Sequence, residues 1–294
     1  PIDGKFTVTG SSVKSKLSSV PACQSVVKKA IVERLKEFYV VDRFEETGAE
    51  YTVKVSLLKD RATVTVDTSG SSLHKRGYRV APVAAPMKEN MAAALVELSF
   101  FRAGRMLVDP CCGSGTIPIE AAMIEMNIAP GLSRRFACDQ WEFIDKSLWK
   151  EEKKKAYEAI DYDKDIKIKA YDINKDAVDA AMENAEEAGV DDCIEFAVAD
   201  IKTLEASEPN GIIITNPPYG ERIGEEEAID KIYKKLGEFF KENPDWSLFL
   251  ITTDDDFEQK AMGRKADRRR KLFNGRLKTT YYQFHGEKPK VKNV

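Results

Sequence analysis

The 294-residue sequence predicts an α/β protein whose main part is a doubly wound, mostly parallel sheet that ends in an antiparallel hairpin. Short apolar runs alternate with amphipathic segments from residue 105 onward, which is the pattern of repeated strand–helix units. The last two β-rich stretches, "RRKLFNG" and "KTTYYQFH", are separated by Asn274-Gly275, a strong hairpin turn signal. A smaller α+β part precedes this sheet.

That smaller part is predicted from one helical and two strand patterns. Apolar residues recur at helical spacing in "PACQSVVKKAIVERLKEF" (21–38), with charged residues on the other face. "YTVKVSLL" and "ATVTVDTS" alternate like paired strands, and "KDR" is a short connection between them. The Pro- and Ala-rich segment 77–86 indicates a linker. We therefore expect one domain over 1–76, a linker over 77–90 and a second domain over 91–294.

The second domain is predicted to begin with the amphipathic helix "MKENMAAALVELSFF" and to continue in strand–helix alternation. Strands are expected at 105–109, 167–172, 194–199, 211–215 and 246–252. Helices are expected at 115–126, 174–188 and 226–241. The charged stretch 150–165 is interpreted as a solvated helix and loop.

Composition narrows the class of protein. The chain is 43% hydrophobic and 32% charged, so it can bury a core, and no apolar run is long enough to span a membrane. Five cysteines at irregular spacing and only two histidines argue against a zinc site and favour a reducing cytoplasmic location. Residues 1–80 carry 14 Lys/Arg against 9 Asp/Glu on an otherwise acidic chain, which suits a nucleic-acid-binding part.

A glycine loop follows the first strand of the main sheet in "MLVDPCCGSGTIPIEAA". Gly113 and Gly115 let the backbone approach a ligand, and the start of the next helix favours a carboxylate or phosphate. No Lys-Ser/Thr follows, so the loop is not a P-loop, and Pro118 stands where a dinucleotide fingerprint needs its third glycine. A tight turn without a ligand remains the competing interpretation.

Three acids at three successive strand ends indicate what that ligand is. Asp109 ends the first strand, Asp172 ends the second in "KAYDIN", and Asp200 follows the third in "FAVADIKTL". Carboxylates in these places can hold ribose hydroxyls, an adenine amine and an ammonium group. S-adenosylmethionine has all of these groups. Its predicted contacts are Asp109, Pro110, Cys112, Gly113, Gly115, Thr116, Asp172, Ile173, Asp200, Ile201 and Asn216, with Lys88 and Glu89 as weaker candidates.

The loop "NPPYGERIG" follows the buried strand "GIIIT". Pro217 and Pro218 end that strand, because proline cannot donate to a sheet ladder. With "DPCCGSGT", "YDIN" and "AD" in this order, the chain resembles the Rossmann-like class I methyltransferases that modify exocyclic amines. The resemblance implies that Asn216 and the Pro217 carbonyl accept the two N–H groups of such an amine, while Pro218 keeps the loop rigid and Tyr219 stacks on the base.

Further blocks narrow the resemblance. "SVKSKLSSVPACQSVVKKAIVERL" resembles the later part of a THUMP RNA-binding domain, and "LHKRGYR", "APMKENMAAAL" and "RKADRRRKLFNGRL" are similar to bacterial THUMP-containing rRNA guanine-N2 methyltransferases of the UPF0020 type. The first domain is therefore expected to be a partial THUMP domain. The expected RNA contacts are Lys14, Lys16, Lys28, Lys29, Lys75, Arg76, Arg79, Arg268, Arg269, Arg270 and Lys271.

The resemblance implies an S-adenosylmethionine-dependent enzyme that methylates guanine N2 in rRNA. Large-subunit (23S) rRNA or a ribosome assembly intermediate is the expected partner, without metal or membrane. An adenine-N6 methyltransferase acting on RNA or DNA would use the same loop. A non-catalytic RNA-binding protein and a protein-glutamine methyltransferase are two further hypotheses.

Overall fold

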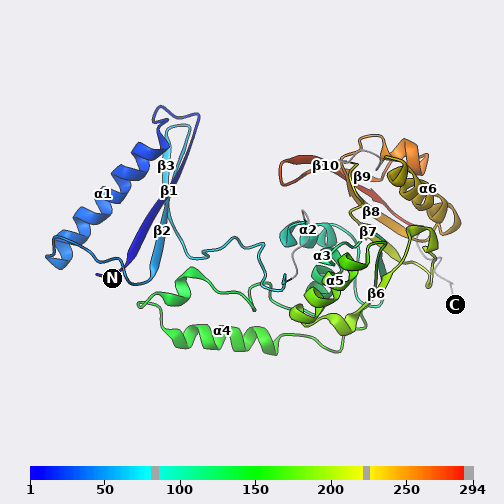
Figure 1. Ribbon diagram of the computed structural model, residues 1–294, viewed down its shortest axis with the longest axis horizontal. Helices are drawn as coiled ribbons and strands as arrows, with labels where there is room; N and C mark the ends of the chain where they lie inside the picture. The colour runs from blue at the N-terminus through cyan, green and yellow to red at the C-terminus, as the bar shows by residue number, and fades with distance from the viewer. Residues whose placement is uncertain (81–85, 221–225, 288–294) are drawn as a thin grey trace, which may run out of the picture. The chain divides into compact units, whose positions relative to one another are not determined.

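The computed structural model describes residues 1–80, 86–220 and 226–287, and it divides into two compact units (Figure 1). The first unit comprises Pro1–Leu73 and Arg134–Lys155, and the second comprises His74–Ser133 and Ala156–Val294. Residues 81–85 of the predicted linker and "ERIG" of "NPPYGERIG" lie outside the described residues. Among the helices in the described ranges, none combines the length and apolar character needed to cross a bilayer.

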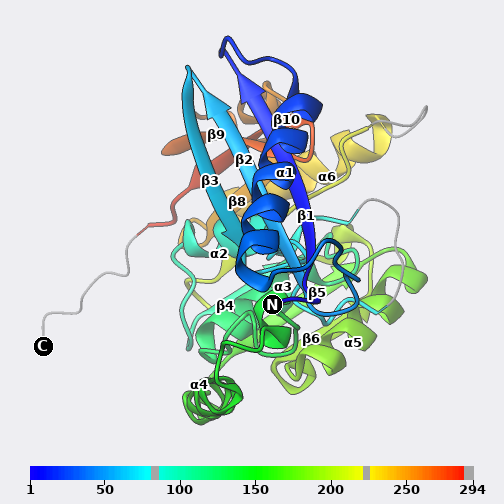
Figure 2. The same cartoon turned by 90° about the vertical axis from the view of Figure 1, so that its left-hand side faces the viewer.

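The first unit contains a three-stranded sheet in the order β1-β2-β3. β2 (Glu50–Leu58) and β3 (Arg61–Asp67) form the expected antiparallel pair, and β1 (Lys5–Val13), which the sequence did not predict, pairs parallel to β2. The expected helix is α1 (Val20–Tyr39), which lies across one face of the sheet (Figure 2). The Ser19 side chain caps it by accepting a hydrogen bond from the Ala22 amide.

Residues 134–155 return to the first unit instead of staying with the main sheet. The Trp141 ring stacks on Tyr51 of β2 at 5.0 Å between centroids, and its indole N–H donates to the Glu50 carbonyl at 3.0 Å. The short helix η1 (Ala137–Gln140) and most of α4 (Lys146–Glu158) belong to this segment. The two compact units therefore do not coincide with the predicted domains 1–76 and 91–294. The predicted domain boundaries stay a prediction.

The second unit contains a seven-stranded sheet in the order β6-β5-β4-β7-β8-β10-β9. Its strands are β4 (Met106–Asp109), β5 (Lys167–Asp172), β6 (Ile194–Val198), β7 (Ile212–Thr215), β8 (Ser247–Thr252), β9 (Arg268–Asn274) and β10 (Leu277–Phe284). The first five are parallel, whereas β10 is antiparallel to both β8 and β9. The predicted doubly wound sheet with a terminal hairpin is confirmed.

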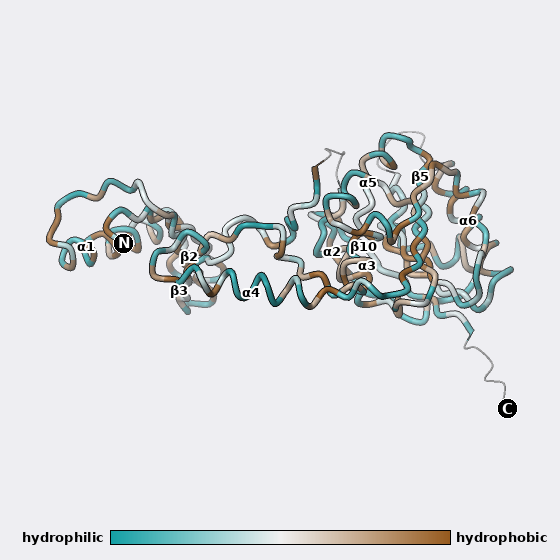
Figure 3. The backbone as a smooth tube through the Cα atoms, turned by 90° about the horizontal axis from the view of Figure 1, so that it is seen from below, coloured by the Kyte–Doolittle hydropathy of each residue, from teal (hydrophilic) through white to brown (hydrophobic). Residues whose placement is uncertain are grey.

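Helices cover both faces of this sheet because alternate strand residues point to opposite faces. Leu107 belongs to a core shared with α2 (Glu89–Glu97), α3 (Thr116–Glu125) and α5 (Lys175–Ala188). Val108 belongs to the opposite core, shared with α6 (Glu226–Glu242) and the π-helical turn η4 (Glu258–Met262). Hydrophobic residues accordingly concentrate in the interior of this unit (Figure 3).

The strand order places a topological switch between β4 and β7. The chain proceeds from β4 through β5 to β6 on one side, then returns to β7 and continues to β8 on the other. Ligands of open α/β sheets bind at the carboxyl ends of the strands beside such a switch. The glycine loop and the Asn216–Tyr219 loop both begin there.

Candidate functional site

The glycine loop connects β4 to α3 and needs glycine at two positions. Gly113 has φ of +53° and Gly115 has φ of +78°, a region that side-chain-bearing residues rarely adopt. A Cβ atom on Gly115 would also lie 3.0 Å from the Ala181 Cβ of α5. The conformation of the loop therefore requires glycine, because of the positive φ angles and the close packing against α5.

Asp172 holds this loop from the end of β5. Its Oδ2 accepts a hydrogen bond from the Gly113 amide at 2.9 Å, and its Oδ1 accepts one from the Asn174 amide at 2.9 Å. Each carboxylate oxygen keeps a second lone pair for other donors. The acid therefore positions the glycine loop and remains able to accept hydroxyl groups from a ligand.

Asp109 lies deeper and is only 1% exposed. Its Oδ1 accepts hydrogen bonds from the Thr215 hydroxyl at 2.8 Å and from the Cys111 amide at 3.2 Å. Its Oδ2 has no partner among the described residues. Burial raises the pKa of this carboxyl to about 7, although the bonds from Thr215 and Cys111 act in the opposite direction.

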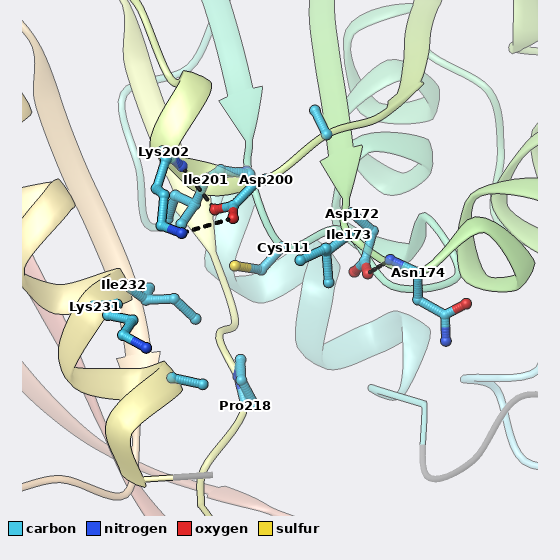
Figure 4. Close-up of a pocket in the computed structure, with 13 residues that line it drawn as sticks. Cys111, Asp172, Ile173, Asn174, Asp200, Ile201, Lys202, Pro218, Lys231 and Ile232 are labelled. Atoms are coloured by element: carbon cyan, nitrogen blue, oxygen red, sulfur yellow. Dashed lines mark hydrogen bonds and ion pairs between the residues drawn. The ribbon is translucent and has the colours of Figure 1, made fainter.

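A cavity of about 580 Å³ opens beside these acids at the carboxyl ends of β4, β5 and β6 (Figure 4). The sequence predicted five of its lining residues as cofactor contacts and a sixth, Pro218, as part of the catalytic loop. The predicted cofactor contacts are Pro110, Asp172, Ile173, Asp200 and Ile201. The sequence did not single out Cys111, Asn174, Ala199, Lys202, Ala228, Lys231 and Ile232.

Each side of this cavity has both an acidic and an apolar side chain. In Figure 4 the Cys111 thiol lies between Asp172 and Ile173 on one side and Asp200 and Ile201 on the other. Ile173 is 71% exposed and lines the cavity, so its apolar side chain is open to a ligand. The cavity therefore combines apolar surfaces with carboxylates.

Asp200 follows β6 by two residues and begins the short helix η3 (Ile201–Thr203). Its carboxylate accepts a hydrogen bond from the Lys202 amide at 3.0 Å and pairs with the Lys202 ammonium at 3.3 Å. The backbone hydrogen bond from Lys202 is the main cause that lowers the pKa of Asp200. This carboxyl is therefore ionised at neutral pH.

Two other predicted cofactor residues support the loop instead of lining the cavity. The Cys112 side chain is 7% exposed and belongs to the hydrophobic core above β4 and β5. The Thr116 hydroxyl accepts a hydrogen bond from Arg79 at 3.0 Å and is also buried. Neither side chain is among those that line the cavity.

A second pocket, of about 360 Å³, shares Pro218 with the first. All four residues of the Asn216–Tyr219 loop line it, and the remainder come from the segment leading into α2 and from the β9–β10 hairpin. These remaining residues are Pro86, Lys88, Asn274, Gly275 and Leu277. Pro218 therefore forms part of the wall of both pockets.

Hydrogen bonds order the side chains of this second pocket. The Tyr219 hydroxyl donates to Asn216 Oδ1 at 2.6 Å, and Asn274 Nδ2 donates to the Tyr219 hydroxyl oxygen at 3.3 Å. The sequence indicated Asn274 only as a turn residue, since its contact with Tyr219 joins positions 55 residues apart. Predicting that contact requires the strand order.

Arg79, which the sequence predicts as an RNA contact, has several partners within the fold. Its guanidinium pairs with Glu89 at 3.0 Å and donates to the Ser114 hydroxyl at 2.9 Å and to Thr116 at 3.0 Å. Only 19% of this side chain is exposed, and the Glu89 side chain is 6% exposed. Glu89 therefore anchors Arg79 and lines neither pocket, while Arg79 fastens the described part of the linker to the glycine loop.

Arg76 is also held by the fold, where the sequence suggested an RNA contact. It pairs with Glu120 of α3 at 3.3 Å, and the buried Tyr78 hydroxyl donates to the same carboxylate at 3.1 Å. Burial raises the pKa of Glu120, and the Arg76 charge opposes that shift. Both arginines are thus attached to buried acids.

The remaining predicted RNA contacts divide by exposure. Lys28 pairs with Glu46 at 2.5 Å, and Arg269 makes a two-pronged contact with Glu258. Arg270 is partly buried, with its Nε lacking a partner among the described residues. The exposed ones are Lys14, Lys16, Lys29, Lys75, Arg268 and Lys271, together with Arg269, whose side chain is 51% exposed although it is paired.

Comparison with known families identifies both parts of the chain. The THUMP domain matches residues 1–67, and the UPF0020 family, described as an RMKL-like methyltransferase domain, matches residues 76–283. A Bacillus subtilis protein named "Putative RNA methyltransferase YpsC" is 51% identical over 286 residues, which are 97% of this chain and 74% of that protein.

Two further relatives add a name and a bound molecule. The "Ribosomal RNA large subunit methyltransferase K/L" of Shewanella baltica (strain OS185) is 38% identical over 88% of this chain, which spans only 38% of that longer protein. The solved structure of SMU.472, "a putative methyltransferase complexed with SAH", superposes with a TM-score of 0.90 at 44% identity. That match covers 98% of this chain and 76% of SMU.472.

Proposed function

Because the chain belongs to the UPF0020 family of RMKL-like methyltransferases and carries a THUMP domain, we propose that it methylates the exocyclic N2 amine of a guanine in large-subunit rRNA. Its methyl donor is S-adenosylmethionine. One observation supports the proposal above the others: two pockets lie on either side of Pro218, and the Asn216 loop lines the smaller one.

The larger pocket has the groups that S-adenosylmethionine requires. Ile173 and Ile201 offer apolar surfaces for an adenine ring, and Asp172 keeps lone pairs for ribose hydroxyls. The unpartnered Oδ2 of Asp109 is a buried acceptor next to Cys111, which lines the cavity, and it suits an ammonium group. We assign these residues to the cofactor, whose sulfonium supplies an electrophilic methyl group and a good leaving group.

The smaller pocket suits the acceptor amine. An aromatic exocyclic amine is a weak nucleophile, because its lone pair is delocalised into the ring. Asn216 Oδ1 and the Pro217 carbonyl accept its two N–H groups, which draws the nitrogen towards tetrahedral geometry and directs the lone pair at the methyl group. The amine nitrogen forms the new N–CH₃ bond while the S–CH₃ bond breaks. The electron pair of the broken bond stays on sulfur, and the methylated nitrogen releases a proton to water.

Access to this pocket requires the base to leave its stack, since a paired base cannot reach Asn216. Tyr219, which lines the pocket, offers a ring for stacking, a contact worth about 1–3 kcal/mol per base. Arg268 and Lys271 lie on β9, whose last residue, Asn274, lines the same pocket. Lys271 is therefore only about 10 Å of extended strand away, close enough to hold a neighbouring phosphate.

The test is to identify the product. The protein would be incubated with unmodified large-subunit rRNA and labelled S-adenosylmethionine, and the RNA digested to nucleosides for mass spectrometry. We expect N2-methylguanosine. N6-methyladenosine would overturn the base assignment and support an adenine-N6 methyltransferase, whereas the absence of any methylated nucleoside would overturn the proposed function.

A further inference from the structure

We propose that Asn274, at the turn of the β9–β10 hairpin, is a positioning residue that sets the orientation of the Asn216 side-chain amide through the hydroxyl of Tyr219. This inference rests on the proposed function for its catalytic meaning. Its structural basis is the pair of hydrogen bonds that joins the three side chains, at 3.3 Å from Asn274 to Tyr219 and 2.6 Å from Tyr219 to Asn216.

These two hydrogen bonds form a relay from Asn274 through Tyr219 to Asn216, and its direction follows from the chemistry of the three side chains. The Nδ2 group of Asn274 can only donate, so it occupies a lone pair of the Tyr219 oxygen. The single Tyr219 proton is then directed away from Asn274 and towards Asn216 Oδ1. A proton directed in this way can be accepted by an amide oxygen but not by an amide NH₂ group.

The relay solves a problem that every catalytic asparagine has. The oxygen and nitrogen ends of an amide are nearly equal in size, so packing alone does not decide which end faces the substrate. With the NH₂ end forward, Asn216 would present a donor to a substrate amine that also donates. The Tyr219 hydroxyl holds the oxygen in place, and the second lone pair of that oxygen remains for the substrate N–H.

The hairpin is well suited to hold Asn274 firmly. Asn274 is paired with Leu277 across the turn, Gly275 adopts φ of +64°, and all three line the smaller pocket. β10 is bonded to β8 along five residue pairs, so the hairpin is an integral part of the sheet. The terminal hairpin thereby contributes one wall of the acceptor pocket and the first donor of the relay.

Single-turnover methyl transfer to unmodified large-subunit rRNA tests the relay in the full chain. We expect Asn274→Ala to slow transfer about threefold to tenfold, the effect of removing one hydrogen bond, with unchanged affinity for S-adenosylhomocysteine. Asn274→Asp should be slower still, because a carboxylate accepts the Tyr219 proton and draws it from Asn216. Lys278→Ala, an exposed control on the same hairpin, should match the wild-type rate.

A double variant distinguishes positioning from general damage. If Asn274 acts through Tyr219, then Asn274→Ala combined with Tyr219→Phe is no slower than Tyr219→Phe alone. The relay would be overturned if the fold-decreases of the two single variants multiplied in the double variant, or if Asn274→Ala were as fast as wild type. Either result would leave the methyltransferase assignment intact.

A spectroscopic measurement tests the relay without any activity. In protein labelled with ¹⁵N-asparagine, the side-chain NH₂ signals of Asn216 are identified by their loss in Asn216→Ala. We expect Asn274→Ala and Tyr219→Phe to shift these signals in the same direction. Unshifted signals in Asn274→Ala would overturn the relay. Failure of the wild-type protein to methylate any RNA base would instead overturn the proposed function.

Discussion

Asp109 and Asp172 show how single side chains combine structural and binding roles in this site. Asp172 accepts the Gly113 amide, and Asp109 joins the Thr215 hydroxyl to the Cys111 amide. Both acids therefore shape the backbone of the loops around the cofactor pocket. Replacing either one by a residue without a side-chain acceptor therefore changes loop geometry as well as ligand contacts.

The buried Asp109 should make stability depend on pH in a definite direction. Its pKa is about 7 in the folded protein, above the ordinary value of 3.8, so between about pH 4 and pH 7 the folded state holds a proton that the unfolded state has released. This group therefore lowers the free energy of unfolding as pH rises, by up to about 1.4 kcal/mol per pH unit. Asp109→Asn removes the effect.

Urea unfolding without cofactor checks this expectation. Asp109→Asn should exceed wild type in stability at pH 8, and the difference should shrink as the pH approaches 4. A difference that is the same at both pH values would contradict the raised pKa of this carboxyl.

The sequence predicted the site residues that belong to a local motif. It missed those whose role depends on a contact with a residue distant in the sequence. Asp172 ends β5 and Asp200 follows β6, so their positions at the cavity could be inferred from strand alternation alone. The sequence shows that Arg79 is charged but not that Glu89, a buried acid on α2, pairs with it. The Asn274–Tyr219 contact likewise depends on which strands are neighbours.

At the scale of elements, the start of α3 depends on Gly115. Gly115→Ala should lower the free energy of unfolding by about 1–3 kcal/mol through its positive φ, with a further decrease from the contact with Ala181. It should also weaken S-adenosylhomocysteine binding in calorimetry, because the glycine loop must move. Gly104→Ala is a matched control, since Gly104 has φ of +79° but nothing within 4 Å of an added Cβ. Equal effects of the two substitutions would contradict the packing argument.

The linker is a second element whose contacts reach the cofactor loop. Arg79→Ala leaves the buried Glu89 without its partner, which typically costs about 3–5 kcal/mol, and frees the Ser114 and Thr116 hydroxyls. We expect lower stability and weaker S-adenosylhomocysteine binding, measured by thermal unfolding and calorimetry. Arg102→Ala is the control, since its side chain is 70% exposed. Unchanged cofactor affinity in Arg79→Ala would show that the linker does not support the loop.

Elements were predictable where local pattern determines them. The buried strands β7 and β8 are continuous apolar runs, and the hairpin has its turn signal. β1 was missed because its sequence, "KFTVTGSSV", is largely polar and its partner β2 lies about 45 residues later. The return of residues 134–155 to the first unit depends on the stacking of Trp141 on Tyr51, which no local pattern indicates.

At the scale of the molecule, basic residues are distributed over both units, yet only some of them are available to RNA. Arg268 and Lys271 are exposed on β9, whereas Arg269 is engaged by Glu258. The double variant Arg268→Ala, Lys271→Ala should bind unmodified rRNA more weakly. It should also reduce the slope of log affinity against log salt by about 0.7–0.9 for each phosphate that the variant no longer neutralises.

Arg269→Ala serves as the comparison for that variant. Because the Arg269 side chain is paired with Glu258, this substitution should lower stability, measured by thermal unfolding. It should change the slope of log affinity against log salt very little. If Arg269→Ala reduced the slope as much as the double variant, the distinction between engaged and available arginines on β9 would be wrong.

Pro218 separates the pocket that we assign to the cofactor from the pocket that we assign to the acceptor amine, and Asn216 is assigned to the acceptor. The most direct test compares S-adenosylhomocysteine affinity with the single-turnover rate of methyl transfer in Asn216→Ala. We predict nearly unchanged affinity and a rate lower by at least about a hundredfold, as expected when preorganised acceptors of the transition state are removed. Equal decreases in affinity and rate would contradict this assignment, because Asn216 would then belong to the cofactor pocket.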